Sequence, residues 1–359
     1  MRIAFLAALL LLSLTTAPAS AQRLTVADVL TRVVVDGDLA GGVVVVRDGA
    51  DVTRYAAGYS DVETKAGFAP NTHIRAASIT KAFVAATILQ LVAEGRIELD
   101  ASVETYLPGR VRGEGIDPNA ITVRQLLRHQ SGLPEYFDKD TLPPTEPKTP
   151  DQLLDMALAR PAQFPPGAKM EYTNTNYIIA GMILEKVTGR PAVDEITWRT
   201  IVPFGLFDTY FPTPGDTGLR EPYARGYEVK DGRRSDVTVF QASAAGMSGE
   251  LISTNEDTSA FITALLDGRV VPRAQLDEMM DVVEMPDGGG LFDYGLGLMT
   301  VNLPCGVTAW GHGGDILGYH SFMAKPFDGP AVSMTFTQSP NAASPKSDPR
   351  VAVLDAIYC

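Results

Sequence analysis

A run of residues that is apolar on every side of a predicted helix constrains the fold more than any other part of the chain. From Ala82 to Val92 nearly every residue is apolar, and a helix without a polar face is stable only when it is buried all round. The rest of the chain must therefore surround it. Ser78 and Lys81 stand at its start, three residues apart, which places hydroxyl and amine on one face, one turn from each other.

A serine and a lysine in this position have the chemistry of a nucleophile and a base. Burial disfavours the charged amine, so we expect the pKa of Lys81 to fall. The first helical turn has free backbone N–H groups, which suit a developing oxyanion at Ser78. The pattern Ser-x-x-Lys is not specific by itself, since chance produces it about once in a chain of this length. The alternative is that Ser78 caps the helix while Lys81 reaches water.

The first 21 residues have the three-part layout of a secretory signal peptide. Arg2 supplies the positive charge, residues 3–14 are apolar, and residues 19–21 (Ala-Ser-Ala) form a small-residue cleavage site. We expect the mature chain to begin near Gln22 and to be exported, either to the periplasm or into the medium. The apolar run is short for a bilayer span, which makes a retained anchor the less favoured alternative. No cysteine adjoins the cleavage point, so a lipid anchor is not indicated.

The amino-acid composition limits the kinds of partner that this protein can bind and predicts one disulfide bond. The formal net charge is −13 at pH 7, which argues against nucleic acid and anionic membrane surfaces as partners. The chain has two cysteines, Cys305 and Cys359. In an exported protein we expect them to form one disulfide, and the alternative is two free thiols. No metal-ligand spacing such as His-Glu-x-x-His occurs in the sequence, so no metal site is predicted.

Strand patterns at the two ends of the chain flank a helical middle. The pattern is helical from residue 121 to about 200. We therefore expect an α/β fold in which one antiparallel sheet is flanked by helices and accompanied by a mainly helical lobe. The sheet lobe would comprise about residues 22–80 and 245–359, the helical lobe about 81–244, and the active site would lie at their seam. The predicted strands are 41–49, 52–59, 294–301, 307–310, 318–324 and 331–337.

Two further clusters combine polar side chains with turn residues. Tyr172 and Asn174 follow a Pro-Gly turn; a phenol beside a cation could ionise below its usual pKa, and the amide could bind a substrate carbonyl. The alternative is a packed tyrosine and a capping asparagine. In the second cluster His312 stands among glycines in a strand-like segment, where an extended ligand could pair with the strand edge. A lone histidine is more often structural, and that role is assigned to the others, His73, His129 and His320.

Three motifs, in this order and at these separations, resemble those of the serine β-lactamase and penicillin-binding family: Ser78-x-x-Lys81, Tyr172-x-Asn174 and His312-x-Gly314. The resemblance is greatest to class C β-lactamases and exported D-alanyl-D-alanine carboxypeptidases. Linking segments such as 126–134 extend it over nearly the whole mature chain. It implies a β-lactamase-like fold and a serine hydrolase that acts through an acyl-enzyme, without a metal or an organic cofactor.

The resemblance also implies a role for each residue of these motifs. Ser78 would attack an amide carbonyl, and Lys81 together with Tyr172 would take its proton. The backbone N–H groups of Ser78 and Asp315 would hold the oxyanion. Substrate would be positioned by Asn174 and by the strand edge that comprises His312, Gly313, Gly314 and Asp315.

Two departures from the family pattern bear on the substrate. Class C β-lactamases carry lysine where this chain has His312, and a histidine is only partly charged at neutral pH. Some carboxypeptidases have an arginine after the segment that matches residues 294–297, and here the next three residues carry no cation. A terminal carboxylate therefore lacks an obvious partner. The pair Cys305 and Cys359, by contrast, resembles the carboxypeptidase branch, in which a late cysteine pairs with one at the terminus.

On balance we expect a D-alanyl-D-alanine carboxypeptidase-like serine hydrolase that acts on a small peptide or a β-lactam, with peptidoglycan as a further candidate partner. The alternatives within the same fold are a β-lactamase, a D-aminopeptidase and an esterase. From another class, the alternative is a non-catalytic protein that binds penicillin or cell wall, although Ser78, Lys81 and Tyr172 are all intact. The sequence has no Gly-x-Ser-x-Gly elbow of the lipase type.

Overall fold

The computed structural model describes residues 24–137, 146–340 and 347–359. The predicted signal peptide, residues 1–21, lies outside these ranges. An eight-stranded antiparallel sheet forms the centre of the molecule, in the order β2-β1-β12-β11-β10-β9-β8-β7. Its strands are β1 (Gly41–Asp48), β2 (Asp51–Gly58), β7 (Val283–Glu284), β8 (Asp293–Tyr294), β9 (Met299–Asn302), β10 (Thr308–Ile316), β11 (Tyr319–Lys325) and β12 (Ala331–Phe336).

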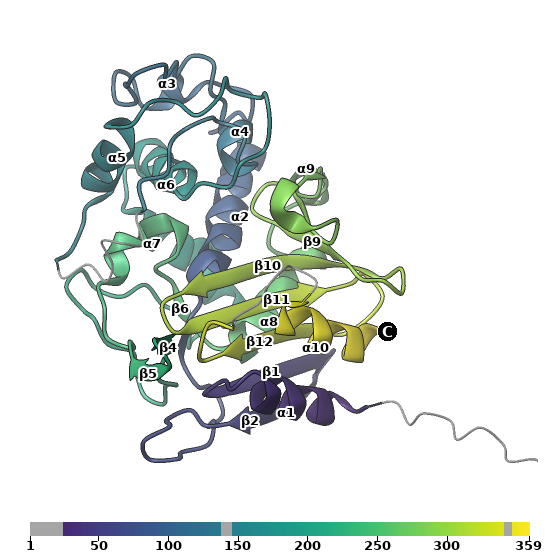
Figure 1. Ribbon diagram of the computed structural model, residues 1–359. Helices are drawn as coiled ribbons and strands as arrows, with labels where there is room; N and C mark the ends of the chain where they lie inside the picture. The colour runs from purple at the N-terminus through teal and green to yellow at the C-terminus, as the bar shows by residue number, and fades with distance from the viewer. Residues whose placement is uncertain (1–23, 138–145, 341–346) are drawn as a thin grey trace, which may run out of the picture.

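Helices cover both faces of this sheet, and a group of helices lies beyond its β10 side (Figure 1). Helices α1 (Val26–Asp36) and α10 (Pro349–Tyr358) pack together on one face, and α8 (Asn255–Leu266) packs on the other. The remaining helices are α2 (Thr80–Ala93), α3 (Val103–Tyr106), α4 (Val123–Leu127), α5 (Pro150–Leu158), α6 (Thr175–Thr188), α7 (Ala192–Ile196) and α9 (Arg273–Met279).

Helix α2 is buried almost along its whole length, as its sequence predicts. Every residue from Thr80 to Leu89 is buried. The helix packs against α6, α7 and α9, and the ring of Phe83 stacks on Phe261 of α8 at a centroid distance of 3.7 Å. Helix α2 thus touches the helical group and a sheet-covering helix together, so its first turn stands where the two parts meet. The division into two lobes at the predicted bounds stays a prediction.

The strand pattern of the C-terminal part differs from the prediction in two places. Segment 294–301 is divided into β8 and β9, because Gly297 adopts a left-handed φ of 72° and turns the chain. Strand β10 continues to Ile316 instead of ending at residue 310, so the His312 cluster lies within it.

A small hairpin, β4 (Tyr227–Lys230) and β5 (Arg233–Asp236), lies within the range that was predicted for the helical lobe. Its turn is formed by Asp231 and Gly232, which both have positive φ, as a type I′ turn requires. The dipeptide Asp-Gly is the sequence signal that would have predicted this hairpin. Two further short strands, β3 (Ile74–Arg75) and β6 (Ile252–Ser253), pair with each other, and β3 ends three residues before Ser78.

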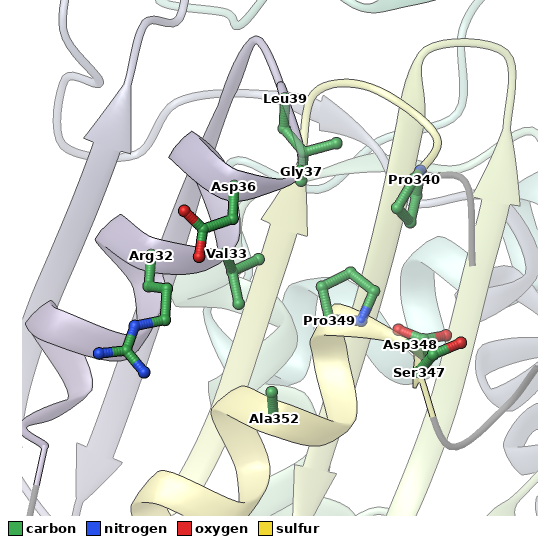
Figure 2. A pocket seen from close by; sticks show the side chains of 10 residues that line it. All are labelled: Arg32, Val33, Asp36, Gly37, Leu39, Pro340, Ser347, Asp348, Pro349 and Ala352. Carbon is green, nitrogen blue, oxygen red and sulfur yellow. The ribbon is translucent and has the colours of Figure 1, made fainter. Parts of the chain in front are cut away.

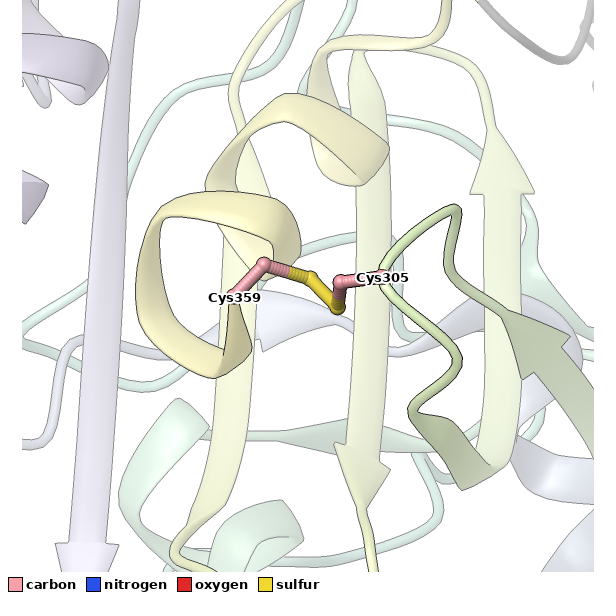
Figure 3. Close-up of a disulfide and its surroundings, with 2 residues drawn as sticks. All are labelled: Cys305 and Cys359. Atoms are coloured by element: carbon pink, nitrogen blue, oxygen red, sulfur yellow. A yellow bond between two sulfur atoms is a disulfide. The ribbon is translucent and has the colours of Figure 1, made fainter.

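Helix α10 is fastened at its end by the predicted disulfide. Cys359 is bonded to Cys305, 54 residues earlier in the chain, and Figure 3 shows the bridge between the end of α10 and the connection from β9 to β10. At its other end, the start of α10 and the last turns of α1 line a hollow of about 540 Å³ (Figure 2). Within the three described ranges, no helix has the length and apolar character needed to cross a membrane.

Candidate active site

Ser78 and Lys81 form the centre of the site. Ser78 lies in a short 3₁₀ turn, Ala77–Ile79, and Lys81 lies in the first turn of α2. Lys81 is fully buried. Its Nζ donates to Ser78 Oγ at 3.0 Å, to Asn174 Oδ1 at 2.8 Å and to the backbone oxygen of Ser248 at 2.8 Å. The alternative in which the amine reaches water is therefore wrong, and neither the 3₁₀ turn nor α2 has a side-chain cap at its start.

The same burial sets the protonation state of the amine. Burial lowers the pKa of Lys81 to about 7, although the carboxylate of Glu135 acts in the opposite direction. An amine with this pKa is neutral in a large fraction of molecules at neutral pH. Because it already touches the Ser78 hydroxyl, it has both the position and the proton affinity of a general base.

The backbone around Ser78 is held in an unusual conformation. Ala77 has a φ of 50°, in the left-handed region that non-glycine residues rarely adopt. Strand pairing supports it on one side, since the N–H of Ala76 donates to the backbone oxygen of Leu251 at 2.9 Å. On the other side β10 approaches closely: a Cβ at Gly314 would lie 2.2 Å from the backbone oxygen of Ala76. Glycine at this position lets β10 reach the nucleophile turn.

Tyr172 adjoins both reactive groups. Its phenol hydrogen-bonds with Ser78, and Lys81 Nζ lies 4.8 Å from the centroid of its ring. The ring stacks on His129 at 4.2 Å and meets Tyr294 edge-on at 5.9 Å. Burial raises the pKa of Tyr172 well above its ordinary value. The expectation of a lowered pKa is therefore wrong, because burial disfavours the phenolate, and the phenol is a proton donor at neutral pH.

Asn174 links the amine to a carboxylate that the sequence motifs did not single out. Its Oδ1 accepts the bond from Lys81, while its Nδ2 and backbone N–H donate to Glu135 Oε2 at 3.1 and 2.8 Å. Glu135 thereby fixes which way the amide points. It directly follows segment 126–134, which resembles the family, and that position is the one signal that could have found it.

His312 lies in the site as a neutral group. It is 2% exposed. Its Nδ1 lies 2.5 Å from the backbone oxygen of Gly313, so Nδ1–H donates there and Nε2 accepts from the Tyr294 hydroxyl at 2.8 Å. Burial, together with the nearby amine of Lys81, lowers the pKa of His312 to about 3. The expectation of partial charge is therefore wrong, and His312 offers no cation to a substrate carboxylate.

A group of ion pairs lies at the end of β10. Asp315 bonds to His320 and accepts from Arg350 Nη1 at 3.3 Å, and Arg350 Nη2 also donates to Asp348 at 2.6 Å. Burial opposes the ionisation of Asp315, yet the neighbouring Arg350 and His320 hold the pKa of Asp315 below its ordinary value. Arg350 is the cation that the sequence did not reveal: it stands at the start of α10, far from every motif, and it is already paired with two carboxylates.

These residues surround a cavity of about 550 Å³. One wall is apolar and consists of Met285, Phe292, Met299 and Phe322. Of the predicted site residues, the structure brings Ser78, Tyr172, Asn174, His312, Gly313 and Asp315 to this cavity, with Lys81 buried behind Ser78 and Gly314 packed against Ala76. The other lining residues are Asp287, Gly288, Asp348 and Arg350.

The family model described as Beta-lactamase matches residues 26–356. Among curated relatives, Penicillin-binding protein 4* of Bacillus subtilis (strain 168) is 26% identical over 305 residues, which are 80% of this chain and 65% of that protein. Protein flp of Staphylococcus aureus (strain N315) is 28% identical over 188 residues, 52% of this chain and 37% of that protein. The aligned part is thus less than two thirds of either relative.

Solved structures match over more of their length. A D-stereospecific amidohydrolase from Streptomyces sp. has a TM-score of 0.83 and 37% identity, covering 92% of this chain and 97% of that one. The D-amino acid amidase from Ochrobactrum anthropi SV3, complexed with L-phenylalanine amide, has a TM-score of 0.80 and 28% identity, with the same coverage. The β-lactamase-like fold is therefore confirmed, and by its family match and these neighbours the chain belongs to the beta-lactamase family of serine hydrolases.

Proposed function

We propose that this protein is an exported serine amidohydrolase that cleaves amides of D-amino acids through an acyl-enzyme at Ser78. The observation that carries the proposal is the contact between Ser78 Oγ and a fully buried lysine amine at 3.0 Å. A lysine used only for stability would sit in water or against a carboxylate. Here the amine of Lys81 donates hydrogen bonds to a hydroxyl, an amide oxygen and a backbone oxygen.

The first half of the reaction forms the acyl-enzyme. Neutral Lys81 takes the proton of Ser78 as Oγ bonds to the amide carbon. The carbonyl oxygen, now negative, is held by the backbone N–H groups of Ser78 and Asp315. The phenol of Tyr172 gives its proton to the leaving nitrogen, the C–N bond breaks, and the ammonium of Lys81 returns a proton to Tyr172. Water then releases the acyl group by the reverse proton transfers.

The charges around the cavity support an ammonium-bearing substrate. Glu135 stands beside Asn174 at the nucleophile, whereas Arg350 is already paired with Asp315 and Asp348. The carboxylate of Asp287 also lines the cavity, so a substrate with a free α-ammonium, such as a D-amino acid amide, meets a negative group there, and the apolar wall suits a large side chain. The likeness to a D-stereospecific amidohydrolase and a D-amino acid amidase supports the same class.

The D-alanyl-D-alanine carboxypeptidase activity expected from the sequence is the second candidate. The presence of Arg350 at the cavity favours it, since this guanidinium could exchange one of its carboxylates for that of a substrate. The likeness to Penicillin-binding protein 4* supports the same candidate.

A substrate panel on the purified mature chain separates these candidates. It contains D- and L-phenylalanine amide, a diacyl-Lys-D-Ala-D-Ala peptide, a chromogenic cephalosporin and a nitrophenyl ester, with Ser78→Ala as the matched control. We expect hydrolysis of the D-amide above the L-amide and none by Ser78→Ala. Turnover of the peptide without turnover of the D-amide would establish the second candidate instead.

Covalent labelling tests the nucleophile separately from turnover. A fluorescent penicillin should label the wild type and leave Ser78→Ala unlabelled; equal labelling of both would remove Ser78 from the mechanism. Labelling without turnover of any substrate in the panel would identify a non-catalytic binding protein. Export is tested by N-terminal sequencing of the protein recovered from outside the cytoplasm, which should begin near Gln22.

A further inference from the structure

A second cavity, of about 210 Å³, lies among the helices and shares none of its lining with the catalytic cavity. Its walls come from α5, α6, α7 and the segment 243–250. They are largely apolar, and the volume is many times what one water molecule needs. The apolar lining is contributed by Leu153, Ile178, Met182, Val193 and Met247.

A carboxyl group without a partner lines this cavity. Across the described part of the chain, no hydrogen bond or ion pair engages the side chain of Glu250. Burial raises the pKa of Glu250 to about 8. The other charged groups that line the cavity are Lys148 and Glu185, and Glu185 Oε1 already accepts from the backbone N–H of Ala192 at 3.1 Å. The side chain of Glu250 is half-buried, and a carboxyl group beside apolar walls without a protein partner is unfavourable.

We propose that this cavity is a second ligand site, which takes a small organic ammonium ion with an apolar group and uses Glu250 as its counter-ion. The apolar walls exclude a bare metal ion, which needs several oxygen ligands. An anion would meet both Glu250 and Glu185, with Lys148 as the one cation among the lining residues. A primary ammonium on an alkyl or aryl group satisfies the carboxylate and fills the apolar space with one molecule.

The site adjoins the catalytic machinery without being part of it. Segment 246–250 is a shared wall: Gly246, Met247 and Glu250 face the second cavity, while the backbone oxygen of Ser248 holds Lys81. Ligand binding can therefore be measured on the Ser78→Ala protein, in which no turnover interferes, and any ammonium ion bound in the catalytic cavity is recognised as a separate binding event that Glu250→Gln leaves unchanged. The proposal does not depend on the substrate of Ser78.

Calorimetric titration with benzylammonium and butylammonium chloride tests the proposal, with benzyl alcohol as the uncharged control. We expect Glu250→Gln, which has the shape of the protonated carboxyl, to weaken binding of either ammonium ion at least about tenfold. Glu63→Gln removes one exposed negative charge elsewhere and should leave binding unchanged. Val193→Phe fills the cavity and should abolish binding while Glu250 is retained, which keeps the test valid should the first variant fold poorly.

Proton release gives a readout that a merely structural carboxyl would not produce. The bound ammonium favours the ionised carboxylate, so affinity should rise up to about tenfold per pH unit between pH 6 and 8 and then level off. At pH 7 roughly 0.9 proton should leave per ligand bound, measured in two buffers of different ionisation enthalpy. Equal binding by wild type and Glu250→Gln, binding without proton release, or no binding of either ammonium ion would overturn the proposal.

Discussion

The pH dependence of Ser78 acylation tests the central feature of the site, a lysine that acts as base because it is buried. The pKa of Lys81 is lowered to about 7, and only the neutral amine can accept the serine proton. The acylation rate should therefore rise with pH up to about 7 and be constant above it. At pH 5, two units below that pKa, about 1% of molecules hold the neutral amine, which predicts a rate about 100-fold below the plateau.

The assay is kcat/KM for an uncharged nitrophenyl ester between pH 5 and 9, because this quantity reports groups of the free enzyme. An ester releases a good leaving group, so the donor role of Tyr172 contributes little to the profile. Lys81→Ala should remove the rising limb and lower the plateau by about 10²–10⁴-fold. Thermal unfolding of the variant, followed by circular dichroism, shows whether the loss is chemical or structural.

Glu135→Gln provides a matched electrostatic control. The carboxylate of Glu135 raises the pKa of Lys81, so its neutralisation should move the rising limb toward lower pH, while the isosteric amide stays beside Asn174. A flat profile, or a rate that still rises tenfold per pH unit at pH 9, would refute the assignment of Lys81. A rate that still rises at pH 9 would instead assign the role of base to Tyr172, because burial raises the pKa of Tyr172.

Two further predictions concern the framework of the site. Gly314→Ala places a Cβ 2.2 Å from a backbone oxygen, whereas the Cβ of Gly313→Ala meets only side-chain atoms, the nearest at 3.2 Å. We expect kcat/KM to fall at least about tenfold in the first variant and less in the second. Equal losses would show that the close approach of β10 to the nucleophile turn does not limit activity. Cys359→Ser opens a loop of 54 residues and should lower the free energy of unfolding, measured in urea, by up to about 4 kcal/mol. Acylation should be retained at low temperature. An unchanged urea midpoint would contradict a stabilising role of the disulfide.

Local features of the fold were predictable because they depend on neighbouring residues. The apolar run after Lys81 predicted a buried helix, and α2 is buried. Thr122 and Gln125 have the spacing of a capping box, and both capping bonds are present at the start of α4. The hairpin at residues 231–232 was missed although its Asp-Gly turn signal is local as well. These features depend on hydrophobic periodicity and turn chemistry within about ten residues of the chain.

The composition of the site was predictable only where motifs mark it. Ser78, Lys81, Tyr172 and Asn174 were named from spacing and resemblance, and the structure joins them by hydrogen bonds. Arg350, Asp348 and the backbone oxygen of Ser248 carry no such mark. They reach the site because α10 lies across the sheet and segment 246–248 packs against α2, and both are contacts between segments far apart in sequence.

The sequence by itself determined the reactive groups, their order along the chain, the buried helix that presents them and the cysteines that form the bridge. Only the tertiary structure decided their protonation states. It made Lys81 a base, kept Tyr172 a neutral donor, and left His312 uncharged. The physical reason is that a pKa is set by the water excluded and the charges gathered around a group. Those surroundings are supplied by segments that meet only when the chain is folded.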